Sequence, residues 1–164
     1  MSDRHQTLDP HGLARVTRSV QAPASVVWEV LADGWLYATW VVGASRVRGV
    51  DSTWPTPGSQ IHHSFGVWPA VIDDETTCLV AEPGRRMVLR PQGWPMGEAE
   101  VILTITPVDE GSCDVEILED AVKGPGTLVP RAARQPVIGV RNRETLQRLA
   151  LMAEGRFRDS TPGD

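Results

Sequence analysis

Apolar and polar residues alternate along several short segments of the chain, with the period of two that is typical of half-buried β-strands. Such segments occupy residues 13–21, 44–52, 59–68, 76–82, 85–91, 98–107 and 112–120. Proline, glycine and acidic residues separate most of them, which predicts tight turns. Because tight turns join antiparallel neighbours, we expect a curved antiparallel sheet of about seven strands with one apolar face.

Two other regions have the spacing of helices. After the first strand, Pro23 precedes a short apolar stripe and a second short turn follows from Trp35, so two short helices are expected there. From about Pro136, residues three and four apart place Ile138, Arg141/Asn142, Thr145, Leu149 and Met152 on one face of a long helix that is predicted to end at Gly155. This helix is the one segment long enough to cover the sheet, which predicts an α+β fold.

The predicted domain is a single one over residues 13–155, with flexible ends at 1–12 and 156–164. The chain has 164 residues and a formal net charge of −5, and no basic cluster interleaved with aromatics, which argues against a nucleic-acid partner. No apolar run approaches a membrane span and the first residues lack a signal-peptide core, so no stable membrane insertion and a cytoplasmic location are expected. The sequence is compatible with a homodimer.

No sequence pattern indicates a metal or a cofactor. Cys78 and Cys113 stand in separate apolar segments without metal-ligand spacing, and they are interpreted as reduced, buried thiols. The acidic run at residues 73–75 is interpreted as a solvated turn, because three adjacent carboxylates lack the further ligands that Ca²⁺ requires. No phosphate-binding loop or nucleophile elbow is present.

The order of the elements and two local motifs resemble a known superfamily. The opening strand is followed by Val20-Gln21-Ala22-Pro23-Ala24-Ser25-Val26-Val27-Trp28-Glu29-Val30-Leu31-Ala32-Asp33, and the last helix carries Arg141-Asn142-x-Glu144-Thr145-Leu146-x-Arg148-Leu149. Together these resemble the START/polyketide-cyclase superfamily, also called SRPBCC, over residues 14–154. The resemblance implies a helix-grip fold and a cavity between sheet and helix for hydrophobic or amphipathic molecules. It supplies no shared catalytic motif.

Several residues are candidates for the wall of that cavity. His62 and His63 are adjacent on a strand and therefore point to opposite faces, and the parity of Ile61 and Phe65 places His63 inward. His63 is the candidate acid or base, with a purely structural role as the alternative. Glu119 and Arg141 are expected to face each other, either as a structural ion pair or in contact with a ligand. Large aromatic side chains are expected as walls or rim: Trp35, Trp40, Phe65, Trp68 and Trp94.

Three functions fit these observations. The first is binding or transport of a hydrophobic or amphipathic small molecule in the internal cavity. The second is a cyclase- or dehydratase-like enzyme that folds a polyketide-like substrate and uses His63. The third is a protein-interaction module whose cavity is filled by its own side chains.

Overall fold

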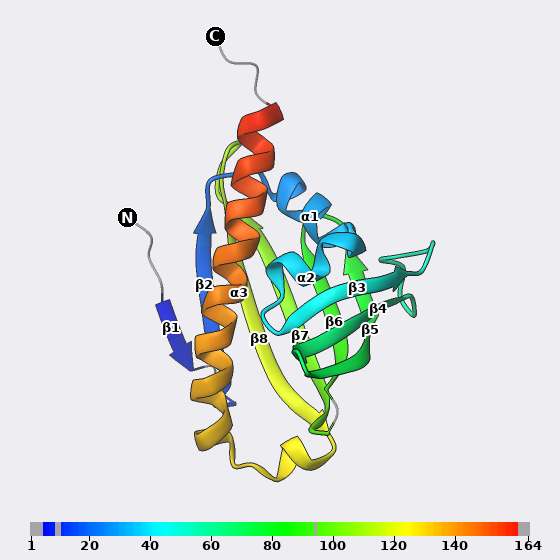
Figure 1. Ribbon diagram of the computed structural model, residues 1–164. Helices are drawn as coiled ribbons and strands as arrows, with labels where there is room; N and C mark the ends of the chain where they lie inside the picture. Colours follow the sequence, from blue (N-terminus) through cyan, green and yellow to red (C-terminus); the bar gives the residue numbers. More distant parts are fainter. Residues whose placement is uncertain (1–4, 9–10, 94, 161–164) are drawn as a thin grey trace.

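The structure is a computed structural model, and it describes residues 5–8, 11–93 and 95–160. One long helix crosses a curved sheet, and two short helices lie beside it (Figure 1). The elements in chain order are β1 (His5–Leu8), β2 (Ala14–Val20), α1 (Ala24–Ala32), η1 (Gly34–Leu36), α2 (Tyr37–Trp40), β3 (Ala44–Val50), β4 (Gln60–Val67), β5 (Ala70–Glu82), β6 (Arg86–Gly93), β7 (Gly97–Pro107), β8 (Cys113–Lys123), η2 (Pro125–Leu128) and α3 (Arg131–Ser160).

All strands of the described residues belong to one antiparallel sheet, in the order β1-β2-β8-β7-β6-β5-β4-β3. Tight connections join β4 to β8 as a meander, and β2 pairs with β8, so the first long strand lies beside the last. The predicted parity is confirmed on the concave face, where Ile61, His63, Leu103 and Ile117 are all buried. The α+β helix-grip architecture expected from the sequence is therefore confirmed, with β1 as an additional short strand.

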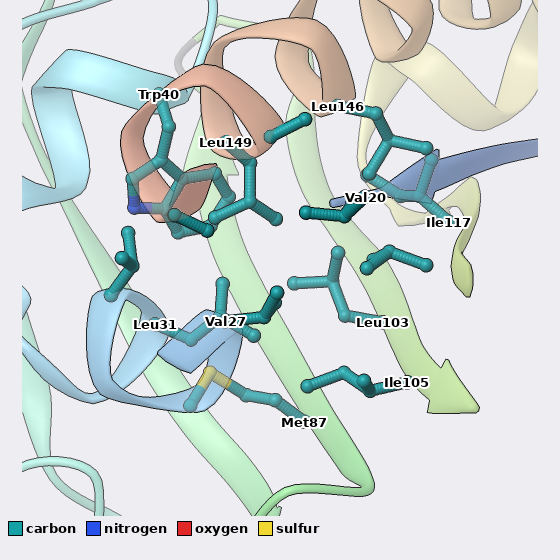
Figure 2. Packing of buried hydrophobic residues seen from close by; sticks show 14 of the residues in the cluster. Val20, Val27, Leu31, Trp40, Met87, Leu103, Ile105, Ile117, Leu146 and Leu149 are labelled. Carbon is teal, nitrogen blue, oxygen red and sulfur yellow. The ribbon is translucent and has the colours of Figure 1, made fainter. Parts of the chain in front are cut away.

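The apolar core fills one end of the space between the helices and the sheet (Figure 2). Leu146 and Leu149 of α3, Val27 and Leu31 of α1, and Trp40 of α2 converge there on the concave face. The strands contribute further fully or almost fully buried side chains: Val20, Met87, Leu89, Leu103, Ile105 and Ile117. This cluster fixes α1, α2 and the C-terminal half of α3 on the sheet.

Parts of the two terminal segments form regular structure that the sequence did not predict. Residues His5–Leu8, expected in a flexible segment, form β1 and pair with β2. Helix α3 begins at Arg131 rather than near Pro136, because the Pro130 carbonyl accepts hydrogen bonds from the first turn and the Arg131 side chain bonds to Asp120. It continues past Gly155 to Ser160, because Phe157 packs against the core and outweighs the low helix propensity of a single glycine.

The interpretation of residues 73–75 as a solvated turn is wrong. They lie within β5, where Asp73, Asp74 and Glu75 pair in register with Ser64, His63 and His62. The turn lies earlier, at residues 68–69, and β5 runs unbroken for 13 residues. The carboxylates are accommodated because Asp73 meets Arg48 at 3.3 Å and Glu75 meets His62 at 3.2 Å.

Gly97 allows β7 to start in close contact with the end of β8. Its φ is +104°, and an added Cβ would lie 1.9 Å from the Lys123 carbonyl oxygen. Gly84 also has a positive φ, of +70°, but no heavy atom lies within 4 Å of its would-be Cβ. The first glycine is therefore required by its contact as well as by its backbone conformation.

We expect Gly97→Ala to lower the free energy of unfolding by about 3 kcal/mol or more, because backbone must move. The matched change Gly84→Ala should cost only about 1 kcal/mol, the cost of the left-handed conformation alone. Urea denaturation of both variants measures the difference. Equal losses would show that the approach of β7 to β8 imposes no constraint.

Candidate ligand-binding cavity

A cavity of about 700 Å³ lies between the N-terminal half of α3 and the concave face of the sheet. Its wall is mostly apolar and comes from β4, β5, β6, β7, β8, α2 and α3, with the β6–β7 turn and η2 at one end. The polar and aromatic side chains of the described wall include Tyr37, Trp40, His63, Glu119, Arg141 and Asn142. The volume falls within the range of small-molecule sites in proteins.

Helix α3 changes character along its length, and this change leaves the space open. Its C-terminal half presents Leu146, Leu149, Ala150 and Ala153, which are all buried in the core. Its N-terminal half faces the sheet with residues of the 133–145 segment that line the cavity instead. The same helix therefore closes the core at one end and covers a cavity at the other.

Polar contacts hold the N-terminal half of α3 against β8. Arg134 donates two hydrogen bonds to the Asp120 carboxylate, at 2.7 and 2.9 Å, and Arg131 donates a third at 3.1 Å. Gln135 donates to the Glu119 carbonyl and to Asp120, and its side-chain oxygen accepts from the backbone N–H of Ala14. Gln135 is 2% exposed, whereas the Arg131 side chain at the outer edge of the network is 55% exposed. The network anchors the helix where apolar packing does not.

Glu119 and Arg141 form the ion pair that the sequence predicted, across the cavity wall between β8 and α3. Glu119 is buried, and burial by itself lowers the pKa of Arg141. The adjacent Glu119 carboxylate outweighs this effect and raises the pKa of the guanidinium above its ordinary value. Arg141 is therefore charged, and its charge is compensated inside the protein.

A hydrogen-bonded chain links Tyr37 of α2 to His63 of β4 through Thr76 of β5. The Tyr37 hydroxyl lies 2.8 Å from Thr76 Oγ1, and His63 Nε2 lies 3.0 Å from the same oxygen. The Tyr37 and His63 rings are also in contact, with centroids 5.0 Å apart. Burial raises the pKa of Tyr37 to about 12. Burial, more than any other cause, lowers the pKa of His63 to about 4, so the imidazole is neutral at pH 7.

Asn142 lies buried in the cavity wall, and its side-chain amide N–H lacks a hydrogen-bond acceptor among the described residues. It follows Arg141 on α3 and is 1% exposed, and its Nδ2 has no hydrogen-bond partner within the described part of the chain. The neighbouring Thr145, one turn further along, accepts a hydrogen bond from the Val42 N–H at 3.3 Å. A buried polar group of this kind normally has a partner, because leaving it unpaired costs roughly 1–3 kcal/mol.

The structure brings together most of the residues predicted for the cavity, but not all of them. Trp40, His63, Phe65, Glu119 and Arg141 line it. Trp35 and Trp68 do not, because η1 and the β4–β5 turn direct them to solvent, where they are 61% and 86% exposed. Trp94 lies outside the described residues.

Three residues of the site were missed in the sequence. Tyr37 lies one helical turn before Trp40, so helix spacing could have placed both on the same face. Thr76 can be connected to His63 only when the pairing register of β4 and β5 is known. Asn142 was placed on the inward face of the long helix without a role.

Comparison with known proteins agrees with this architecture. The family model described as polyketide cyclase / dehydrase and lipid transport matches residues 13–154. The fold is similar to that of the Zhui aromatase/cyclase from Streptomyces sp. R1128, with a TM-score of 0.70 and 19% identity, covering 92% of this chain and 98% of that one. A Rhodobacter sphaeroides protein gives a TM-score of 0.71 at 18% identity, with coverage of 93% and 99%. A START superfamily protein from Mycobacterium smegmatis gives 0.60 at 21%, with coverage of 91% and 99%.

A sheet wrapped around a long C-terminal helix, with a cavity between them, defines a helix-grip protein of the START-like class. The chain belongs to the polyketide cyclase / dehydrase and lipid transport family, whose model covers almost all of it. No curated protein matches its sequence. Among the described residues, no helix is long and apolar enough to cross a membrane.

The depressed pKa of His63 predicts a specific loss of stability in acid. The unfolded histidine titrates near its ordinary pKa of 6.5, whereas the folded one titrates near 4. The unfolded state therefore binds more protons between these values, and stability falls as the pH decreases from 6.5 towards 4. We expect the wild type to lose about 2 kcal/mol more than His63→Gln between pH 7.5 and 4.5, measured by urea denaturation. Parallel curves for the two proteins would contradict the assignment.

Proposed function

We propose that this protein binds or carries a hydrophobic or amphipathic small molecule in the cavity under α3. The observation that carries the proposal is the cavity itself, about 700 Å³ with a mostly apolar wall and a few polar groups. The unpaired Asn142 Nδ2 supports it, because a ligand could supply the missing acceptor. The family described for polyketide cyclases and lipid transport is consistent with such a role.

The open volume also bears on a third function, that of a protein-interaction module. That function requires the protein's own side chains to fill the space between sheet and helix. They do so only at the end formed by Leu146 and Leu149, and they leave the other end hollow. The structure therefore favours the two functions that use a ligand.

A large side chain placed inside the cavity should weaken ligand binding without unfolding the protein. Ala99 lines the cavity on β7, so Ala99→Trp should weaken binding of the neutral dye N-phenyl-1-naphthylamine by roughly tenfold or more. Thr104→Trp, on the outward face of the same strand, is the matched control and should bind the dye as the wild type does. Dye fluorescence measures affinity, and native mass spectrometry shows whether a co-purified molecule is lost in parallel. Undiminished binding by Ala99→Trp would exclude the cavity as the site.

Catalysis of a cyclisation or dehydration in the same cavity is the second candidate. The chain from Tyr37 through Thr76 to His63 favours it, because a neutral imidazole coupled to a phenol can move a proton at the cavity wall. The fold is shared with an aromatase/cyclase, but at 19% identity this likeness concerns the fold alone.

Binding and catalysis respond differently to the loss of His63. A catalytic His63 should impose its titration on the rate, so kcat for a poly-β-ketone substrate would fall as pH decreases towards 4 and would drop by about 100-fold or more in His63→Gln. A binding His63 should alter affinity alone. An activity that His63→Gln retains in full, with an unchanged pH profile, would remove His63 from any mechanism.

A further inference from the structure

Every glutamate and arginine in the described wall of the cavity has an ion-pair partner of opposite sign. These lining residues are Glu98, Glu119, Arg134 and Arg141. Glu98 pairs with Lys123 at 3.3 Å, Arg134 with Asp120 at 2.7 Å, and Arg141 with Glu119. His63, the remaining ionisable base of the wall, is neutral at pH 7. The cavity therefore offers no uncompensated charge to a ligand.

The Arg141–Glu119 pair leaves little net charge at the cavity wall. Glu119 is 4% exposed, so a ligand carboxylate that approached Arg141 would also approach the buried Glu119 carboxylate, and a ligand cation would approach Arg141. The charged ligand would also lose its own hydration without an uncompensated partner in return. The pair therefore disfavours charged headgroups.

The uncharged polar groups of the wall favour a different ligand chemistry. The Asn142 amide lacks an acceptor for its Nδ2 among the described residues, and the Tyr37 hydroxyl already shares a hydrogen bond with Thr76. Carbonyl and hydroxyl oxygens are common neutral groups that accept a hydrogen bond from an amide N–H. Most of the remaining wall is apolar, so the rest of the ligand must be apolar as well.

We propose that the cavity selects uncharged apolar molecules that carry a carbonyl or hydroxyl oxygen, and that Asn142 donates a hydrogen bond to that oxygen. This inference rests on the proposed binding function and specifies its ligand class. Asn142 is a specificity-determining residue here, and the Arg141–Glu119 pair excludes charged analogues.

Three probes of one shape test the inference: anthracene, 9-anthracenemethanol and anthracene-9-carboxylate, titrated at pH 7.5 by fluorescence. We expect the alcohol to bind about tenfold more tightly than the carboxylate. Asn142→Leu should reduce the preference for the alcohol over anthracene by about fivefold. Gln147→Leu also replaces a side-chain amide by leucine on α3, but at a residue outside the described cavity wall, and should leave that preference unchanged.

A second variant tests the ion pair. Glu119→Gln frees the Arg141 charge and should improve binding of anthracene-9-carboxylate by about tenfold, while anthracene itself is unaffected. The proposed ligand class would be overturned if the wild type bound the carboxylate more tightly than the alcohol. It would also be overturned if Asn142→Leu kept the wild-type preference for the alcohol over anthracene. Either result would leave binding in the cavity intact. Failure of all three probes to bind, or binding that survives Ala99→Trp, would instead overturn the proposed function.

Discussion

The site depends on the hydrogen bonds and ion pairs that the Asp120 carboxylate forms with the start of α3. This carboxylate accepts hydrogen bonds from Arg131, Arg134 and Gln135, and so joins the first turns of α3 to β8. Burial alone would raise the pKa of Asp120, but the hydrogen bonds and charge of Arg134 outweigh burial and hold the pKa below its ordinary value. The carboxylate therefore stays ionised, and it fixes a stretch of helix that buries few apolar side chains.

This polar anchor explains how a cavity can persist beside a well-packed core. If α3 were held by apolar packing along its whole length, side chains would fill the space beneath it, since protein interiors are close-packed. The helix instead packs through Leu146 and Leu149 at one end and through the Asp120 network at the other. The segment between these two attachments covers a hollow whose wall holds the Arg141–Glu119 pair and the Tyr37–Thr76–His63 chain.

Periodicity was sufficient to predict the sheet, the covering helix and the inward direction of His63 and Glu119, because alternation along a strand is a local property. The aromatic residues were harder to place. Tryptophan suits both rims and cores, and only the positions of η1 and the β4–β5 turn determine that Trp35 and Trp68 face solvent. The role of Thr76 depends on the pairing of two strands, and the isolation of the Asn142 amide depends on everything around it. Properties of this kind are not contained in any short stretch of sequence.

The unequal attachment of α3 also has a dynamic consequence. Segments with few buried apolar contacts open locally at a lower free energy than the core does. The turns around Arg134 and Gln135 can therefore detach from β8 while the packing around Leu149 stays intact. Such a local opening would widen the access to the space beneath these turns, at a free-energy cost separate from the global stability of the fold.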